Sequence, residues 1–180
     1  MKKIIIVIPT YNEHENIFKL VKKILKILPK AIIYIVDDTK YEKSPIKFKE
    51  KRIKYFLRIN CKGRGSAVLF GLKKALKDKT SYLFLEMDAD FSHNPNEIIK
   101  NIKIFKKKNL DLLIASRYLP QSKIINWGIS RRLFSKLSNF LAKLILNVGL
   151  TDHTNGFRIY SRRSVAVSYT HLRAHETRGN

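Results

Sequence analysis

The sequence predicts an α/β fold in which a mostly parallel β-sheet carries helices on both faces. Short apolar runs alternate along the 180 residues with segments whose apolar residues recur at helical spacing, a pattern typical of β-α-β units. The apolar runs are continuous, as expected for strands covered on both faces. With 44% hydrophobic residues, a chain of this length is able to bury the core of one domain.

Five apolar runs predict the strands, and three segments between them predict the helices. The strands are expected at Ile4–Ile8, Ile32–Val36, Ile53–Arg58, Tyr82–Met87 and Leu110–Ala115. The helices are expected at Ile17–Leu28, Ala67–Leu76 and Ile98–Phe105. Pro29 ends the first helix, because proline cannot continue one. Asn94, Pro95 and Glu97 fit the N-cap, N1 and N3 positions ahead of the third helix.

A fourth helical segment, Trp127–Leu150, carries a broad apolar stripe with basic and polar residues between the apolar ones. Ordinary core packing is the default explanation of such a stripe. A basic amphipathic helix is also able to rest on a membrane surface and receive a lipid. The sequence leaves both interpretations open.

The last residues do not share the pattern of the rest of the chain. Val167–Asn180 shows neither helical nor strand periodicity and resembles the translation of a sequencing-library adapter. We therefore expect one domain over residues 1–166, truncated at its C-terminus, and a non-native tail over residues 167–180. His171, His175 and Glu176 in that tail are accordingly not candidates for a metal site.

The net charge of +23 is compatible with nucleic acid, with anionic membranes or phosphate substrates, and with a codon bias toward lysine. The lysines are scattered along helical segments, as on solvated helix faces. Because no recognition motif accompanies the charge, we expect no nucleic-acid partner. The single cysteine, Cys61, excludes an intramolecular disulfide and fits a reducing compartment. The first apolar run is too short for a signal peptide or a membrane span.

Asp88 and Asp90 follow the fourth predicted strand and are separated by one residue. Two carboxylates at this spacing are able to face the same side of an extended segment. Ligands of open α/β sheets bind at the carboxyl ends of strands, and carboxylates there suit Mg²⁺ or Mn²⁺ held together with substrate phosphates. The alternative is that both aspartates cap a turn.

Polar clusters follow the first, second and fifth predicted strands as well as the fourth, so all would gather at one edge of the sheet, where a nucleotide is expected. The clusters are Pro9-Thr10-Tyr11-Asn12-Glu13, Asp37-Asp38, Asp88-Ala89-Asp90 and Ser116-Arg117-Tyr118. In this order, with Lys62-Gly63-Arg64-Gly65, the extended run Met87–Pro95 and Gly156-Phe157-Arg158, they closely resemble the family 2 glycosyltransferases of the GT-A (Rossmann-like) fold. The resemblance is to the polyprenyl-phosphate (dolichol-phosphate) mannosyltransferase group and spans Lys3–Arg162.

The resemblance implies an inverting, metal-dependent hexosyltransferase that moves mannose from GDP-mannose to a polyprenyl phosphate. It assigns the donor nucleotide to Pro9, Tyr11, Glu13, Asp37 or Asp38, and Lys62. Asp88 and Asp90 would hold Mg²⁺ or Mn²⁺ against the donor diphosphate, with Asp90 and Arg117 the catalytic candidates. Arg117, Arg131 or Arg132, and Arg158 are the candidates for the acceptor phosphate, which arginine is able to bind bidentately.

The resemblance also implies a membrane partner. The enzyme would act at the cytoplasmic face of the membrane, peripherally or anchored by a missing C-terminal region. A phosphate monoester acceptor is largely ionised at neutral pH and needs positioning more than a catalytic base. This removes the need for His153 as a base.

Two departures from the family pattern affect the donor site. Thr39-Lys40-Tyr41 follows Asp38 where small residues and glycine are usual, and Arg64 replaces a smaller apolar residue. UDP-glucose, another nucleotide sugar, or a saccharide acceptor are therefore alternatives within the class. The alternative outside the class is a basic protein that binds nucleic acid or membrane on a degenerate transferase scaffold.

Overall fold

The computed structural model describes residues 2–40, 47–59, 63–119 and 128–176. The strands are β1 (Lys3–Thr10), β2 (Ile32–Asp37), β3 (Ile53–Leu57), β4 (Ser81–Glu86), β5 (Leu112–Ile114) and β6 (Arg158–Ser161). The helices are α1 (His14–Ile27), α2 (Arg64–Leu76), the 3₁₀ helix η1 (Pro95–Glu97), α3 (Ile98–Lys107), α4 (Ile129–Leu146) and α5 (Arg162–Glu176). These elements form the α/β architecture that the sequence predicts.

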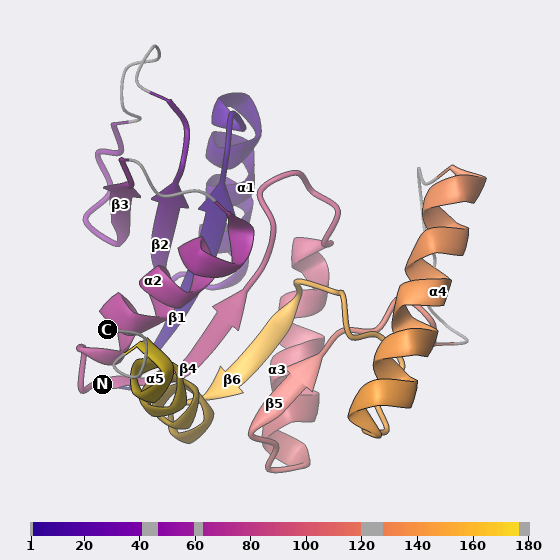
Figure 1. Ribbon diagram of the computed structural model, residues 1–180. Coiled ribbons are helices and arrows are strands. Elements are labelled where there is room, and N and C mark those ends of the chain that lie inside the picture. Colours follow the sequence, from indigo (N-terminus) through magenta and orange to yellow (C-terminus); the bar gives the residue numbers. More distant parts are fainter. Residues whose placement is uncertain (1, 41–46, 60–62, 120–127, 177–180) are drawn as a thin grey trace.

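The six strands of the described residues form one sheet in the order β3-β2-β1-β4-β6-β5 (Figure 1). β1 pairs in parallel with both β2 and β4, and β2 pairs in parallel with β3. β6 runs antiparallel to its neighbours β4 and β5. The carboxyl ends of β1, β2 and β4 therefore meet at one edge, where the Rossmann-type rule places a ligand.

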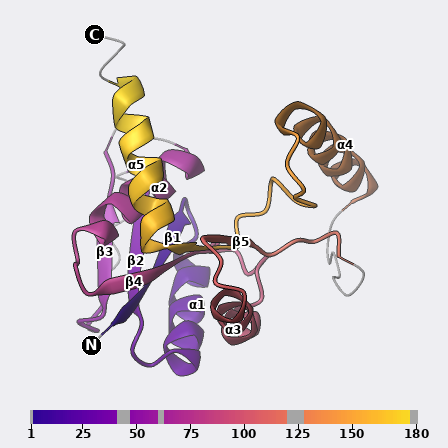
Figure 2. The same cartoon turned by 90° about the horizontal axis from the view of Figure 1, so that it is seen from below.

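Helices cover the sheet on both sides, so its central strands are buried (Figure 2). α1 and α3 pack on one face through a core that includes Ile17, Leu20 and Phe105, and α2 and α5 pack on the other face. The side chains of β1 from Ile5 to Ile8 are fully buried. This explains why β1 is a continuous apolar run without alternation.

The predicted helix ends agree with the structure where a local signal marks them. α1 ends at Ile27, two residues before Pro29. The Asn94 side chain accepts a hydrogen bond from the main-chain N–H of Asn96 at 3.1 Å, so Asn94 is the N-cap that the sequence predicts. Pro95 occupies the first position of η1, which leads directly into α3.

The sequence did not predict β6 and α5. β6 has four residues and pairs Ile159 with Leu85 and Leu113, so its strand conformation depends on partners far away in the chain. α5 continues through the segment in which no periodicity was found and reaches Glu176. Val165, near the start of this helix, packs in the core beneath α2 and supports the helix there.

α4 lies beside the sheet beyond β5, away from the two helix layers (Figures 1 and 2). It ends at Leu146, and the C-cap residue Asn147 has a positive φ of 47°, the left-handed conformation common after a helix. Among the described residues, no helix is both long enough and apolar enough to cross a bilayer.

The close packing of α2 on β1 depends on Gly71. A Cβ atom added there would lie 2.4 Å from Cγ1 of Val7, which is fully buried and unable to move aside. We expect Gly71→Ala to lower the free energy of unfolding by about 1–3 kcal/mol, measured by urea denaturation. Gly65→Ala, in the first turn of the same helix, meets no atom within 4 Å and should leave stability unchanged or raise it. Equal effects of the two substitutions would contradict this account.

Candidate functional site

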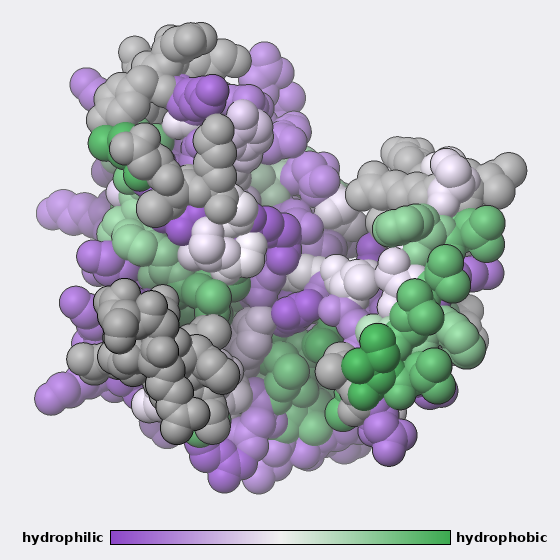
Figure 3. All heavy atoms as spheres, in the orientation of Figure 1, coloured by the Kyte–Doolittle hydropathy of each residue, from purple (hydrophilic) through white to green (hydrophobic). Residues whose placement is uncertain are grey.

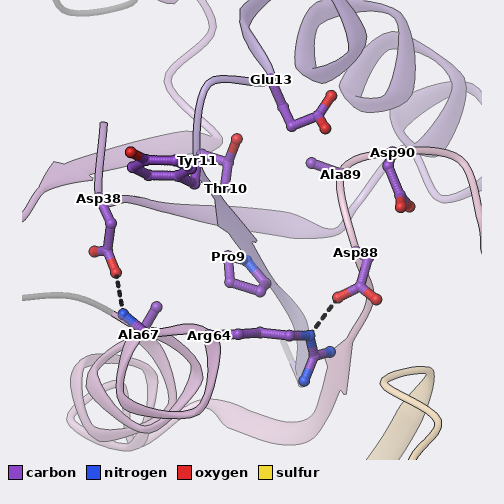
Figure 4. A pocket seen from close by; sticks show the side chains of 11 residues that line it. Pro9, Thr10, Tyr11, Glu13, Asp38, Arg64, Ala67, Asp88, Ala89 and Asp90 are labelled. Atoms are coloured by element: carbon purple, nitrogen blue, oxygen red, sulfur yellow. Dashed lines mark hydrogen bonds and ion pairs between the residues drawn. The ribbon is translucent and has the colours of Figure 1, made fainter. Parts of the chain in front are cut away.

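A cavity of about 480 Å³ opens where β1, β2 and β4 end (Figure 4). Its wall consists of residues at and just after the ends of these strands and of the N-cap and first turn of α2: Pro9, Thr10, Tyr11, Glu13, Asp38, Gly63, Arg64, Ala67, Asp88, Ala89 and Asp90. Asp88 and Asp90 lie on one side, and Tyr11 and Asp38 lie opposite (Figure 4). The strand-end clusters of β1, β2 and β4 thus lie together, as the sequence predicts.

The turn after β1 presents an aromatic ring and a hydroxyl to the cavity. Asn12 has a φ of +57°, and its main-chain N–H donates to Oγ1 of Thr39 at 2.8 Å. This turn leaves Tyr11 half exposed at the cavity wall. Oγ1 of Thr10 is buried and has no hydrogen-bond partner among the described residues. A buried hydroxyl costs free energy unless it is paired, so a polar ligand atom at this wall would satisfy it.

Of the two adjacent aspartates at the end of β2, Asp38 lines the cavity. Its carboxylate accepts two hydrogen bonds from the Arg58 guanidinium, at 2.7 and 2.6 Å, and one from the main-chain N–H of Gly63 at 3.2 Å. Its orientation is therefore fixed before any ligand binds.

Asp37 is fully buried beside the cavity. Its carboxylate accepts hydrogen bonds from the Thr39 hydroxyl at 2.5 Å and from the Tyr55 hydroxyl at 2.6 Å. Because those bonds occupy its oxygens inside the fold, Asp38 is the better placed of the two donor-site candidates.

The loop after β4 is held in shape by its own side chains. The main-chain N–H of Asp88 donates to Nδ1 of His93 at 3.0 Å, and that of Ser92 donates to Oδ1 of Asp90 at 2.9 Å. Burial alone would raise the pKa of Asp90, but the hydrogen bonds from Ser92 and the charge of His93 hold it below its usual value. Burial lowers the pKa of His93, although Asp88 and Asp90 oppose this. Asp90 is thus a carboxylate at neutral pH.

Asp88 and Asp90 are suitable ligands for a hard divalent cation. Among the residues that the structure describes, no group of three or more His, Cys, Asp or Glu side chains is arranged to hold an ion. Mg²⁺ is usually bound by one or two carboxylates, with substrate phosphates and waters completing its shell. Two carboxylates on the wall of a cavity therefore fit a cation that binds together with a phosphate ligand.

The Arg117 guanidinium forms a fork with Asp152. Its Nε and Nη2 donate to the two carboxylate oxygens at 2.7 and 2.8 Å, and Nη2 also donates to Oγ1 of Thr154 at 2.6 Å. Hydrogen bonding to Asp152 raises the pKa of Arg117. These hydrogen bonds join the segment after β5 to the loop before β6, so Arg117 holds the two segments in position.

The other basic candidates from the sequence are three arginines and one lysine, and the one whose side chain the structure describes, Arg158, does not line the cavity. Arg158 donates to the main-chain carbonyls of Asn155 and His153, at 2.8 and 3.0 Å, so its guanidinium serves the loop before β6. Arg131 and Arg132 belong to the start of α4, but their side chains lie outside the described part of the structure. Lys62 also lies outside the described residues.

α4 contacts the rest of the molecule through polar side chains. Ser135 and Asn139 are buried. Ser135 accepts a hydrogen bond from the Tyr118 hydroxyl at 2.6 Å, and Oδ1 of Asn139 accepts one from the main-chain N–H of His153 at 2.6 Å. The segments on either side of the Arg117–Asp152 pair thus hold this helix.

The apolar side of α4 faces away from the body of the molecule (Figure 3). Its large apolar side chains are 46–77% exposed: Leu133, Phe134, Leu137, Phe140, Leu141, Leu144 and Ile145. We call these seven residues the α4 apolar face. Of the two interpretations of the stripe, core packing within this chain is wrong, because the residues that pack inward are polar.

Two residues of the site were not predicted as site residues. Arg64 lines the cavity, and its Nε donates to Oδ1 of Asp88 at 2.6 Å. Glu86, at the end of β4, is 1% exposed and pairs with Arg64 at 2.7 Å. Two features of the sequence could have indicated them: Glu86 is a charged residue inside an apolar strand, and Arg64 is a basic residue in the glycine-containing loop.

Comparison with known proteins relates the chain to glycosyltransferases. Residues 5–167 match the family described as "Glycosyl transferase family 2". The polyprenol monophosphomannose synthase of Mycolicibacterium smegmatis is 34% identical over 167 residues, which cover 89% of this chain and 62% of that protein. The dolichol-phosphate mannosyltransferase of Pyrococcus furiosus is 35% identical over 163 residues, covering 86% of this chain and 45% of that protein. The chain therefore spans less than two thirds of the length of these two relatives.

Solved structures support the fold. The glucosyl-3-phosphoglycerate synthase of Mycobacterium tuberculosis, crystallised with Mn²⁺, UDP-glucose and phosphoglyceric acid, superposes with a TM-score of 0.60. The match covers 90% of this chain and 57% of that protein at 14% identity. At this level of identity the likeness is one of GT-A-like architecture.

The Arg117–Asp152 pair makes a pH-dependent contribution to stability. Burial would raise the pKa of Asp152, but hydrogen bonds from Arg117 hold it below its usual value. We expect Asp152→Asn to lower the free energy of unfolding by about 3 kcal/mol at pH 7. Because the pKa of Asp152 is lower in the folded than in the unfolded protein, its carboxylate stabilises the fold at pH values above its unfolded-state pKa. This stabilisation is lost as the pH falls through its folded-state pKa. The difference from wild type should therefore narrow below about pH 4.

Urea denaturation at a series of pH values measures this difference. Asp111→Asn removes a carboxylate that pairs with Arg163 at the surface and accepts a hydrogen bond from the Ser161 hydroxyl at 2.7 Å, and this substitution should change stability much less. A gap between wild type and Asp152→Asn that persists unchanged at pH 3, or that is absent at pH 7, would contradict the assignment.

Proposed function

The chain belongs to glycosyl transferase family 2, and from that premise we propose that it transfers mannose from GDP-mannose to a polyprenyl phosphate. The observation that carries the proposal is the placement of Asp88 and Asp90 across one cavity from Tyr11 and Asp38. The relatives named polyprenol monophosphomannose synthase and dolichol-phosphate mannosyltransferase support the choice of substrates.

The donor nucleotide would occupy the side of the cavity formed by β1 and β2. Tyr11 and Pro9 offer apolar surface for a base, and the fixed Asp38 carboxylate is able to accept hydrogen bonds from base or ribose. The unpaired Thr10 hydroxyl gives the same wall a further polar contact. Glu13 lines the upper part of this wall.

The donor diphosphate would lie toward the loop after β4. Asp88 and Asp90 would hold Mg²⁺ or Mn²⁺ there, and that cation would stabilise the negative charge of the departing nucleoside diphosphate. The hydrogen bond from Ser92 keeps Asp90 ionised and oriented for this role. The His93 side chain fixes the main chain of Asp88 in the same way.

The acceptor would approach from the side of α4. A lipid phosphate is already an anion at neutral pH, so the site has to position it rather than remove a proton. Because Arg117 is occupied by Asp152, we assign it to positioning the loops that carry α4. Arg131 and Arg132 at the start of α4 remain our candidates for the acceptor phosphate.

The α4 apolar face would rest on the membrane that carries the acceptor. Its seven large side chains face away from the protein, while Ser135 and Asn139 attach the helix to the body. An amphipathic helix with this arrangement gains free energy by burying its apolar side in the lipid interface. The net charge of +23 would favour an anionic surface.

Removal of Asp90 tests the catalytic proposal. We expect Asp90→Ala to lower the rate of mannose transfer to polyprenyl phosphate by a factor on the order of 10² to 10³, and EDTA to stop the wild-type reaction until Mg²⁺ or Mn²⁺ is restored. Asp78→Asn, which lies before β4 at the opposite edge and pairs with Lys3, is the matched control. Full activity of Asp90→Ala, or of wild type in EDTA, would overturn the metal site.

The same assay distinguishes the alternatives. UDP-glucose that competes with labelled GDP-mannose and is itself turned over would change the donor, and transfer to a free saccharide would change the acceptor. Salt-sensitive binding to DNA without turnover of any nucleotide sugar would favour a binding protein instead.

Polar substitution of the α4 apolar face tests the membrane proposal. The triple variant Phe134→Ser, Phe140→Ser, Leu144→Ser should lose most of its binding to vesicles of phosphatidylcholine and phosphatidylglycerol in a sedimentation assay, because each side chain buries apolar area in lipid. A control variant carries serine at Phe18, Leu69 and Ile104, which are exposed on α1, α2 and α3. Equal vesicle binding by the two variants would rule out α4 as the membrane contact.

A further inference from the structure

The Arg64 side chain crosses the floor of the cavity to Asp88 (Figure 4). Its guanidinium also pairs with Glu86. Its Nε donates to Oδ1 of Asp88 at 2.6 Å, and its Nη2 lies 2.7 Å from Oε1 of Glu86. Nη2 also donates to the main-chain carbonyl of Gly156 at 3.4 Å. One guanidinium thus bridges a carboxylate of the proposed metal site, Asp88, and a second carboxylate behind it, Glu86.

The fold reserves the space that this guanidinium occupies. A Cβ atom on Gly156 would lie 1.8 Å from Nη2 and 2.6 Å from Cζ of Arg64. Any other residue at position 156 would therefore displace the guanidinium. The fold therefore accommodates the Arg64 guanidinium specifically, because its position depends on a glycine that comes 92 residues later in the chain.

Glu86 explains why a cation is needed here. It is 1% exposed, and its other oxygen accepts a hydrogen bond from the Tyr160 hydroxyl at 2.6 Å. A buried carboxylate is costly unless a cation and hydrogen bonds compensate it. Glu86 thus retains Arg64 in the site even when Asp88 takes another partner.

We propose that Arg64 is a resident counter-cation that competes with the metal for Asp88 and turns to the donor diphosphate when the metal binds. This inference rests on the proposed function, because it takes Asp88 and Asp90 as the metal ligands. A guanidinium bonded to Asp88 repels a divalent cation at the same carboxylate. A diphosphate supplies negative charge for both cations and relieves this repulsion. The metal should therefore bind weakly alone and much more tightly together with nucleotide.

The measurement is Mn²⁺ binding, followed by the electron paramagnetic resonance signal of free Mn²⁺, with and without GDP and, in parallel, UDP. Without nucleotide, Arg64→Gln should bind Mn²⁺ about tenfold more tightly than wild type, since the competing charge is gone. The factor by which nucleotide tightens Mn²⁺ binding should be at least about tenfold smaller in this variant. By linkage, Mn²⁺ should tighten nucleotide binding by an equally reduced factor.

Arg52→Gln is the matched control. Arg52 precedes β3, at the edge of the sheet opposite the cavity, and pairs with Glu50. The substitution removes the same charge, so Mn²⁺ binding should equal that of wild type. Arg64→Lys keeps the charge and should retain weak binding of Mn²⁺ alone. If Arg64→Gln does not fold because Glu86 loses its partner, the double variant with Glu86→Gln removes both charges and should show the same tight binding.

Three outcomes would overturn the inference. Mn²⁺ affinity of Arg64→Gln equal to or weaker than that of wild type shows that Arg64 does not compete for Asp88, and it leaves the metal site intact. An equal gain in Arg52→Gln assigns the effect to net charge. Absence of Mn²⁺ binding in every variant at saturating GDP or UDP overturns the proposed metal site, and this inference with it.

Discussion

The structure depends on central strands that are covered by helices on both faces. Polar groups inside such layers cost free energy unless they are paired, so β1, β2 and β4 are apolar until they leave the layers. The polar residues of the cavity begin at that boundary. Glu86 is still buried between the helix layers, and its carboxylate is paired with Tyr160 and Arg64. The chemistry of the site is thus set by where burial ends.

This constraint also decides what could be predicted from the sequence. Buried strands and amphipathic helices have local patterns, so β1, β2, β4, α1 and α3 were predicted close to their observed bounds. The polar residues that follow β1, β2 and β4 could be placed at one edge for the same reason. β6 could not, because its four residues become a strand only by pairing with β4 and β5.

Side-chain partners were harder to predict than positions. Asp37 and Asp38 are adjacent, and only the observed fold shows that Tyr55 and Thr39 occupy the first while Arg58 and Gly63 orient the second. Asp152 is 35 residues away from Arg117, so no local pattern could indicate that Arg117, a candidate phosphate ligand, is held by this carboxylate. The apolar stripe of α4 was visible in the sequence, but its direction depends on Ser135 and Asn139.

The antiparallel pairing of β5 with β6 has a consequence for how this scaffold is able to change. The chain leaves the sheet at Ile114 and returns at Arg158, which is its register partner in the neighbouring strand. The residues between them, which include α4, form one long connection whose two ends lie next to each other in the sheet. The free energy of closing such a connection rises only slowly with its length. The segment between β5 and β6, to which we assign acceptor recognition, can therefore change in length or sequence during evolution while β1, β2 and β4 keep their register.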